Sequence, residues 1–365
     1  MPTEEPSHET FRRNSYFRSL DGLRFFSIVP VIWHHSTERP LLGILGKGPL
    51  GVDLFFAISG FLITTLLLRE HADRGRISIG RFYARRALRI FPLYYGVLGL
   101  YVVRALFFLQ DGPMRAHFFG SLPYYATYTS NWFVDFDVPH PVIFAFAWSL
   151  ATEEQFYVVW PWVVGLGRSW VLPVIVAIAL LALDQSVEWG FFLQALPPAG
   201  LARRMIRSIA SPICMGALLA CALHHARSFA IARPILGGRL ASPVIFAVLV
   251  ATVASDAAPL SMVQLFMTLL VGACSVRSDH GLAFLTDGAI VRRIGSVSYA
   301  MYLFHVAVIT GVRKALLHDH RVLSSDAFVF ALAFVITVGL ALTSERWLER
   351  PLAARRARLR STPSP

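Results

Sequence analysis

The stretch LDGLRFFSIVPVIWHHS, residues 20–36, places an arginine and a histidine eleven positions apart in an otherwise apolar segment. Eleven steps of roughly 100° make about three helical turns, so Arg24 and His35 are expected on one helix face, about 16 Å apart along the axis. That separation is roughly half of the hydrocarbon thickness of a bilayer. Ionisable side chains at such depth are costly, and they indicate a functional site rather than a simple anchor.

The composition of the chain is typical of a membrane protein. Its 365 residues are 55% hydrophobic and 15% charged, and the mean hydropathy is +0.56. A soluble domain is usually about 25% charged, and its apolar residues do not need to form long blocks as they do here. Because helices satisfy their own backbone polar groups in lipid, we predict an all-α, polytopic integral membrane bundle.

Breaks between the apolar blocks predict about ten transmembrane helices. They are expected at residues 22–40, 51–69, 90–109, 143–166, 170–184, 209–226, 241–255, 260–276, 294–312 and 326–345. An even number of spans places both termini on one side of the membrane. Most of the 34 lysines and arginines then fall in segments on that side, which predicts that both termini are cytoplasmic.

The ends of the chain are expected to be short and polar. Residues 1–18 are predicted to form a cytoplasmic N-terminal tail, residues 19–352 the membrane domain, and residues 353–365 a basic cytoplasmic tail. The N-terminal segment lacks the apolar core of a cleaved signal peptide. No second folded domain is expected after the last span.

The charge and the cysteines restrict the possible partners. A net charge of +12 would suggest nucleic acid in a soluble protein, but here the arginines mark cytoplasmic loops, so the expected partner is the lipid bilayer and not nucleic acid. Cys214, Cys221 and Cys274 lie in apolar blocks, without CxxC or Cys/His spacing. They are expected to be reduced packing residues, and no metal site is predicted.

His35, preceded by His34, is the first candidate for chemistry. A neutral imidazole can accept a proton from a hydroxyl, or it can be acylated itself. The alternative is a buried histidine that is hydrogen-bonded to a neighbouring helix, with Arg24 only anchoring the span at the headgroups. The segment SYAMYLFH places a second titratable group, His305, inside a span, and it has the same alternative.

The segment GVDLFFAISGFLI, residues 51–63, contains small and polar residues at membrane depth. One interpretation is that Ser59, Gly60 and Phe61 shape a pocket for the acyl donor or the acceptor. The alternative is helix packing, because small residues let two helices approach closely.

Arginines are concentrated in RFYARRALRIFPLYY, residues 81–95. Arg81, Arg85 and Arg89 repeat every four residues and would form one basic stripe on a helix, with Arg86 beside it. Guanidinium groups suit phosphate oxygens, which makes the stripe a candidate cradle for the phosphates of coenzyme A. The alternative is a topology signal or a contact with anionic lipids.

The segment WSLATEEQFYVVWP, residues 148–161, places two adjacent carboxylates, Glu153 and Glu154, in the predicted fourth span. Within a membrane they need a cation, a histidine or water. We expect Glu153 or its neighbour Glu154 to orient His35, to stabilise its cation or to hold an acceptor hydroxyl. A structural ion pair with a loop arginine is the alternative.

Taken together, these segments resemble the membrane acyltransferase family 3, which includes O-acetylases of surface polysaccharides and acyltransferases of macrolides. Seven blocks match in the family's order over about residues 19–352. They are LDGLRFFSIVPVIWHHS, GVDLFFAISGFLI, FYARRALRIFPLYY, Asn131-Trp132, WSLATEEQFYVVWP, SVSYAMYLFH and ERWLERP.

The resemblance implies ten spans in a bacterial inner membrane and acyl transfer from acyl-CoA, by family frequency acetyl-CoA, without a metal. The acceptor would be a hydroxyl of a surface glycan, a glycolipid or a macrolide. The family's essential residues fall on Arg24, His35, Ser59, Gly60, Phe61, Arg86, Arg89 with Arg85 beside them, and Glu153. His34 departs from the common pattern, so its role stays open. Some relatives carry a C-terminal esterase-like domain outside the membrane. No such domain is expected here, so transfer is expected to finish in the membrane domain or on another protein.

The expected mechanism brings a cytosolic thioester to His35. Arg24 and the arginines at 85–89 would hold the phosphates, and His35 would act as general base or take the acyl group briefly. A proton-coupled transporter or flippase of a glycolipid or acyl group is the alternative, because intramembrane Arg, Glu and His suit such a pathway. The absence of repeated halves in the sequence argues against it. A sensor or scaffold without turnover is the third class.

Overall fold

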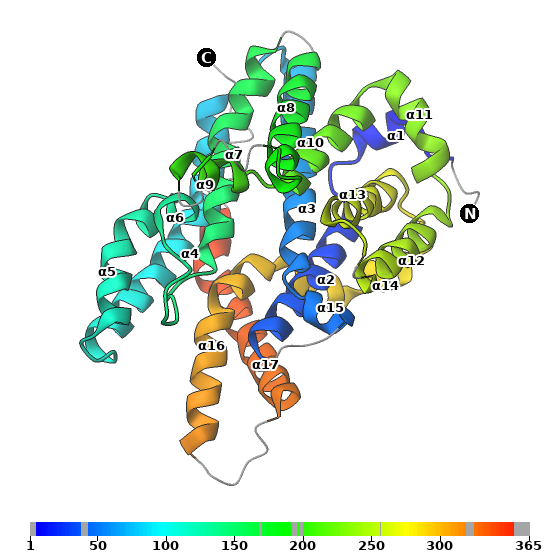
Figure 1. Ribbon diagram of the computed structural model, residues 1–365. Coiled ribbons are helices and arrows are strands. Elements are labelled where there is room, and N and C mark those ends of the chain that lie inside the picture. Colours follow the sequence, from blue (N-terminus) through cyan, green and yellow to red (C-terminus); the bar gives the residue numbers. More distant parts are fainter. Residues whose placement is uncertain are drawn as a thin grey trace. The chain divides into compact units, whose positions relative to one another are not determined.

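The computed structural model describes residues 5–37, 43–167, 170–191, 196–197, 200–255, 257–318 and 325–353. Every regular element within these ranges is helical, which confirms the all-α prediction (Figure 1). The chain forms two compact units. The first contains residues 1–73 and 212–347, and the second contains residues 74–211 and 348–365.

The first unit contains the N-terminal helices and most of the C-terminal half of the chain. Its elements are α1 (His8–Arg13), α2 (Arg18–His35), η1 (Gly43–Lys47), α3 (Leu50–Arg74), α10 (Ser211–His224), α11 (Ala226–Leu236), α12 (Ala241–Ala254), α13 (Leu260–Val276), α14 (Ala283–Thr286), α15 (Ala289–Ser296), α16 (Ser298–His318), α17 (Asp326–Ser344) and the π-helical turn η2 (Glu345–Glu349).

The second unit contains the middle of the chain. Its elements are α4 (Ile79–Phe107), α5 (Pro113–Ala126), α6 (Ser130–Phe133), α7 (Ala147–Leu166), α8 (Val171–Glu188) and α9 (Leu201–Arg207). Helix α4 begins eleven residues before the third predicted span and includes the whole arginine stripe. Pro92 lies inside this helix, which continues past it to Phe107.

Helix length and composition confirm a polytopic membrane protein. Four helices are long and apolar enough to cross a membrane, and the number rises to seven if each of three bent helix pairs is one span. Helices also occupy the expected spans at α2, α7 and α13, but α2 and α7 carry charged residues and α13 has only 17 residues. The predicted number of ten spans and the side of the termini therefore stay predictions.

The N-terminal segment is folded onto the first unit through aromatic side chains. Phe11 of α1 and Phe17 are buried, and Phe17 contacts the ring of Phe61 with the centroids 5.5 Å apart. Arg69 of α3 donates hydrogen bonds to the backbone carbonyls of Phe11 (2.7 Å) and Asn14 (2.6 Å). The expected tail of residues 1–18 thus contains a packed helix, because two phenylalanines give this polar segment an apolar anchor.

Helix α2 packs closely against α14 and α15. A Cβ atom on Gly22 would lie 2.1 Å from the carbonyl oxygen of Thr286, and one on Gly295 would lie 1.7 Å from that of Asp21. Only glycine allows backbones to approach to this distance. The two glycines therefore determine where the N-terminal half of α2 crosses its neighbours.

Replacing Gly295 with alanine should separate α15 from α2. The added methyl group cannot move away from a backbone carbonyl, so we expect a loss of about 1–3 kcal/mol in the free energy of unfolding. Thermal unfolding of the purified protein in detergent would measure it. Gly339→Ala is the matched control, since nothing lies within 4 Å of its added Cβ. Equal stability of the two variants would contradict the close α2–α15 packing.

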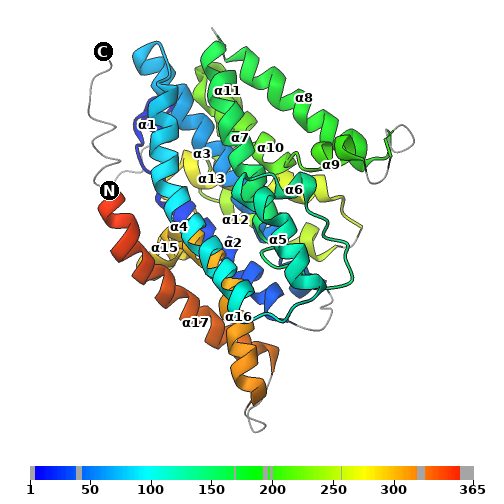
Figure 2. The same cartoon turned by 90° about the vertical axis from the view of Figure 1, so that its left-hand side faces the viewer.

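Helices α16 and α17 pack side by side at the end of the first unit (Figure 2). Helix α16 follows α15 after a bend of 72°, so the two form a broken segment rather than one straight helix. Arg313 of α16 donates hydrogen bonds to the carbonyl of Ser36 (2.5 Å) and to Asp326 of α17 (3.2 Å). The C-terminus of a helix carries a partial negative charge, so the guanidinium of Arg313 stabilises the end of α2, directly after His35.

Candidate active site

Two histidines from different helices meet at the C-terminal end of α2. The rings of His35 and His305 are in edge-to-face contact, with centroids 4.8 Å apart and planes at 81°. His305 of α16 is fully buried, whereas His35, the last residue of α2, is exposed. The contact with a buried ring restricts the orientation of the exposed one.

Backbone carbonyls determine which nitrogen of each ring carries the hydrogen. Nδ1 of His35 lies 2.9 Å from the carbonyl oxygen of Val31, and Nδ1 of His305 lies 2.6 Å from that of Tyr302. A carbonyl can only accept, so each Nδ1–H is the donor. In the neutral rings, Nε2 therefore carries the lone pair. His35 is thus arranged to accept a proton or an acyl group at Nε2.

Arg24 lies in the same helix and is held by its own turn. Its Nη1 donates a hydrogen bond of 2.8 Å to Oδ1 of Asp21, and the hydroxyl of Tyr16 donates to Oδ2 of the same carboxylate. The pKa of Tyr16 is raised by burial and by its hydrogen bond to Asp21, so it remains a neutral donor at physiological pH. Two donors on one carboxylate keep Arg24 in place near the N-terminal end of α2.

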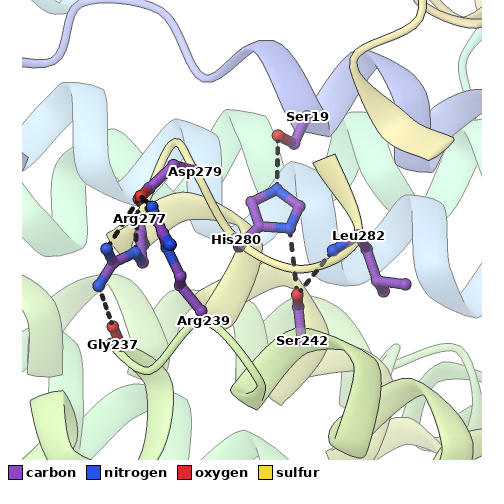
Figure 3. A network of polar contacts seen from close by, with 8 residues as sticks. All are labelled: Ser19, Gly237, Arg239, Ser242, Arg277, Asp279, His280 and Leu282. Carbon is purple, nitrogen blue, oxygen red and sulfur yellow. Dashed lines mark hydrogen bonds and ion pairs between the residues drawn. The ribbon is translucent and has the colours of Figure 1, made fainter. Parts of the chain in front are cut away.

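A buried histidine, His280, joins three segments near the start of α2 (Figure 3). Ser19 donates its only hydroxyl hydrogen to Asp287 (2.7 Å), so Nε2–H of His280 must donate to Ser19 (2.8 Å). Ser242 then donates to Nδ1 of His280 (3.1 Å) and accepts from the backbone N–H of Leu282 (3.3 Å). Burial lowers the pKa of His280, which agrees with this neutral arrangement. The network connects the start of α2 with the start of α12 and with the loop before α14.

A second part of Figure 3 is an ionic cluster in the same loop. Asp279 accepts hydrogen bonds from Arg239 (2.9 and 3.1 Å) and from Arg277 (2.5 and 2.9 Å), and Arg277 also donates to the carbonyl of Gly237 (3.3 Å). Hydrogen bonds from Arg277 lower the pKa of Asp279 to about 2. The charged carboxylate therefore stabilises the folded state.

This cluster predicts a pH-dependent stability. The folded pKa of Asp279, about 2, lies below the ordinary value of 3.8, so its contribution is present above about pH 4 and is lost as the pH falls toward 2. Because the side chain is 41% exposed, we expect no more than about 1 kcal/mol. Thermal unfolding of the wild type and of Asp279→Asn from pH 2 to 7 would measure it. A difference that does not shrink at low pH would contradict this assignment.

The residues Ser59, Gly60 and Phe61 lie on α3 in the first unit. A Cβ atom on Gly60 would lie 2.0 Å from the carbonyl oxygen of Ile213 in α10, and Phe61 is completely buried in the core. These contacts support the packing alternative for Gly60 and Phe61. A pocket role for Ser59 stays a prediction.

In the second unit, one tyrosine, Tyr157, contacts both the predicted cofactor-binding Arg86 and the predicted Glu153. The guanidinium carbon of Arg86, on α4, lies 3.5 Å from the ring centroid of Tyr157, on α7. The hydroxyl of Tyr157 donates a hydrogen bond to Glu153. Glu154 interacts electrostatically with both Arg86 and Glu153. Arg85 and Arg89 lie on the same turns of α4.

Arg86 retains buried donors that the described residues do not satisfy. Its Nε and Nη2 atoms are inaccessible to solvent and have no hydrogen-bond acceptor within the described ranges. A cation–π contact satisfies the face of a guanidinium but not its N–H groups in the plane. Leaving such donors unmet costs about 1–3 kcal/mol each. A phosphate-binding role for these donors stays a prediction.

Two amide side chains hold α7 in its orientation. Asn131 of α6 and Gln155 of α7 exchange two hydrogen bonds of 2.9 Å, and Asn131 also donates to Thr152 (3.1 Å). Gln155 donates further to the carbonyl of Tyr128 (2.8 Å). Gln155 lies two residues after Glu153 on α7, and this pair restricts the rotation of the helix about its axis.

The predicted site residues are distributed over both units. Arg24, His35, Ser59, Gly60 and Phe61 belong to the first unit, whereas Arg85, Arg86, Arg89 and Glu153 belong to the second. The partners that sequence reasoning missed are Asp21, Tyr16, Tyr157, Gln155 and the His35–His305 contact. Hydropathy patterns carry no signal for such pairs, although Asp21 stands three residues before Arg24 and is thus one helical turn away.

The length and composition of the helices define a polytopic membrane protein. The sequence model of the acyltransferase family 3, described as an acyltransferase domain, matches residues 17–345. The chain therefore belongs to this family and is a membrane acyltransferase.

Curated relatives agree with the family. Peptidoglycan O-acetyltransferase OatA of Listeria monocytogenes serovar 1/2a is 31% identical over 180 residues, which cover 46% of this chain and 28% of that protein. A candidate peptidoglycan O-acetyltransferase of Bacillus subtilis (strain 168), YrhL, is 34% identical over 165 residues, which cover 42% and 24%. A candidate O-acetyltransferase of Staphylococcus aureus (strain COL) is 36% identical over 157 residues, which cover 41% and 25%. The matches span about a quarter of each relative's length. No solved structure matches the chain.

Proposed function

We propose that this protein transfers a short acyl group, by default acetyl, from acyl-CoA to a hydroxyl of a cell-surface glycan. The observation that carries the proposal is the geometry of His35. Its Nδ1–H is occupied by the Val31 carbonyl, and its ring is exposed at a helix end with Nε2 as the lone-pair nitrogen. The peptidoglycan acetylation named for its relatives supports a surface polymer as the acceptor.

The donor supplies an activated thioester, and the residues of this chain supply binding and proton transfer. Buried N–H groups of Arg86 without acceptors among the described residues fit phosphate oxygens. Arg85 and Arg89 add positive charge on the same helix. Arg24, anchored by Asp21, adds a further guanidinium at the other end of the helix that carries His35. We assign the coenzyme A phosphates to the arginines of α4, and a phosphate-binding role for Arg24 stays a prediction.

His35 performs the proton transfer in this mechanism. Its Nε2 removes the proton from the acceptor hydroxyl while the hydroxyl oxygen attacks the thioester carbonyl. The carbon–sulfur bond then breaks, and the same Nε2–H returns the proton to the departing thiolate, which leaves as the free thiol. His305 acts as a positioning residue, because its buried ring lies against that of His35.

In this proposal Glu153 positions a neighbouring side chain and does not take part in the proton transfer. It accepts the hydrogen bond of Tyr157, whose ring lies under Arg86. A fixed carboxylate thereby holds the aromatic platform of the phosphate-binding arginine. The orientation of His35 by Glu153 stays a prediction.

Turnover of a labelled thioester tests the function. Purified protein in lipid vesicles would be incubated with acetyl-CoA labelled in the acetyl group, together with a soluble glycan acceptor, and both free thiol and acetylated glycan would be measured. We expect equal amounts of the two products. Movement of label across the membrane without release of thiol would instead support the transporter alternative and would reject the enzyme.

A further inference from the structure

The end of α1 and the segment that follows it are fixed to the first unit at several points. The guanidinium carbon of Arg69 lies 5.4 Å from the ring centroid of Phe11 and 5.4 Å from that of Phe17. The same guanidinium donates to the carbonyls of Phe11 and Asn14, and the backbone N–H of Tyr16 donates to the side chain of Asn14 (3.2 Å). This segment therefore has a defined place from which Tyr16 reaches α2.

Tyr16 and Arg24 share the carboxylate of Asp21. Oδ1 accepts a hydrogen bond of 2.8 Å from Nη1 of Arg24, and Oδ2 accepts one from the hydroxyl of Tyr16. Pairs of arginine and carboxylate frequently have two parallel hydrogen bonds, but this pair has one, and the tyrosine occupies the second oxygen. The carboxylate is held in place, because a Cβ atom on Gly295 would lie 1.7 Å from the carbonyl oxygen of Asp21 and the side chain of Asp21 is only 9% exposed.

The single hydrogen bond leaves one edge of the Arg24 guanidinium free. Its Nε and Nη2 atoms have no hydrogen-bond acceptor among the described residues. The side chain is 19% exposed, so a ligand can reach this edge from solvent. Two N–H groups in one plane match two oxygens of a phosphate group.

We propose that Tyr16 is a positioning residue, whose hydroxyl occupies one oxygen of Asp21 and thereby keeps the free edge of Arg24 available to a phosphate group. The inference rests on the proposed function, since the soluble phosphate ligand considered is acyl-CoA. An anionic lipid headgroup offers the same chemistry, and the experiment separates these two sources. The N-terminal segment thus becomes part of the binding machinery.

Removing the hydroxyl should change the pairing of Arg24. In Tyr16→Phe, Oδ2 of Asp21 loses its donor within a largely buried side chain, and a charged acceptor without a donor is costly. A second N–H of Arg24 meets this acceptor when the guanidinium turns into the arrangement with two parallel hydrogen bonds. The edge that a phosphate needs is then occupied. The tyrosine is 53% exposed, so the variant leaves no cavity in the core.

Equilibrium binding of acetyl-CoA to the full-length protein in phosphatidylcholine vesicles is the first measurement. Tyr16→Phe should bind acetyl-CoA about tenfold more weakly, the effect of one lost charge-assisted contact. KM for thiol release should rise by the same factor while kcat changes less than about twofold, because the contact binds the ground state and the transition state equally. Incorporation of 4-aminophenylalanine at position 16 restores an N–H donor and should restore binding. Tyr124→Phe is the matched control, since this 37% exposed tyrosine makes no hydrogen bond among the described residues.

A double-mutant cycle tests whether Tyr16 acts through Arg24. In the Arg24→Gln background the guanidinium is absent, so Tyr16→Phe should change acetyl-CoA binding by less than about twofold. A merely structural role would weaken binding by the same factor in both backgrounds, and that result would overturn the inference. Acetyl-pantetheine lacks the phosphates, so the wild type and Tyr16→Phe should use it equally.

A second ligand separates the two sources of phosphate. If the donor is the ligand, acetyl-CoA binding falls in Tyr16→Phe and the binding of spin-labelled phosphatidylglycerol is unchanged. If a lipid headgroup is the ligand, phosphatidylglycerol binding falls and acetyl-CoA binding is unchanged. No change with either ligand overturns the inference.

Failure of the proposed function has a different signature. A wild-type protein that binds acetyl-CoA but releases no thiol in the presence of a glycan acceptor rejects the acyl transfer. The effect of Tyr16→Phe on binding is still measured in that case. Normal thiol release with unchanged binding of both ligands in Tyr16→Phe rejects the role of Tyr16 alone.

Discussion

Replacing His35 with alanine should reduce acyl transfer by about 1,000-fold or more, with little change in the folded state. General acid–base catalysis contributes roughly 10²–10⁴-fold, and here one nitrogen both removes and returns the proton. The side chain is exposed at the end of α2, so its removal leaves no cavity in the core. Release of free thiol from acetyl-CoA in the presence of a glycan acceptor is the measurement.

Three further measurements are needed to interpret the activity of His35→Ala. Size-exclusion chromatography and thermal unfolding in detergent would show whether the variant folds. His34→Ala tests whether the adjacent ring shares the proton transfer. Rapid quenching with labelled acetyl-CoA and no acceptor separates the two chemical routes, because only the covalent route leaves label on the protein. Full activity of His35→Ala would end this mechanism.

Replacing Arg86 with alanine should weaken the binding of acyl-CoA by about 100-fold. Two charge-assisted hydrogen bonds from Nε and Nη2 are worth about 1.5–3 kcal/mol each, and the loss of part of that total accounts for the expected change. Equilibrium binding of acetyl-CoA, together with KM for thiol release, measures it. Arg86→Lys should recover only part of the binding, since an ammonium group lacks the planar fork.

A truncated donor distinguishes phosphate binding from a structural role for Arg86. Acetyl-pantetheine has the same thioester but lacks the phosphates, so the wild type and Arg86→Ala should use it equally. Arg104→Ala, near the other end of α4, is the control for a loss of positive charge on the same helix and should bind acetyl-CoA normally. An equal penalty with both donors would show that Arg86 only supports the fold through Tyr157.

Several features could be predicted from local patterns alone. Hydropathy blocks predict the membrane helices, and helical spacing predicts that Arg24 and His35 share one helix, as they do in α2. The repeat of arginines predicts a basic segment, which is helical at the start of α4. The three cysteines are buried, as expected for packing residues. Each of these properties depends on residues within a few turns of one another, so it can be read along the chain.

The partners of the site residues depended on contacts between helices far apart in the sequence. His305 meets His35 across 270 positions because α16 packs on α2. Tyr157 lies under Arg86 because α7 packs on α4. Helical periodicity specifies which residues share a face, but it does not specify which faces meet or in what register.

The amino-acid sequence by itself determined the membrane class, the helices and the types of chemical group that each one carries. Only the tertiary structure decided that Gly22 and Gly295 let α2 approach its neighbours closely, that a carbonyl leaves Nε2 of His35 as the lone-pair nitrogen, and that an apolar cavity lies beside α2. The physical reason is that helix formation and hydropathy arise from neighbours in the chain. Close backbone approach, buried donors without acceptors and cavities arise from the way in which complete helices pack.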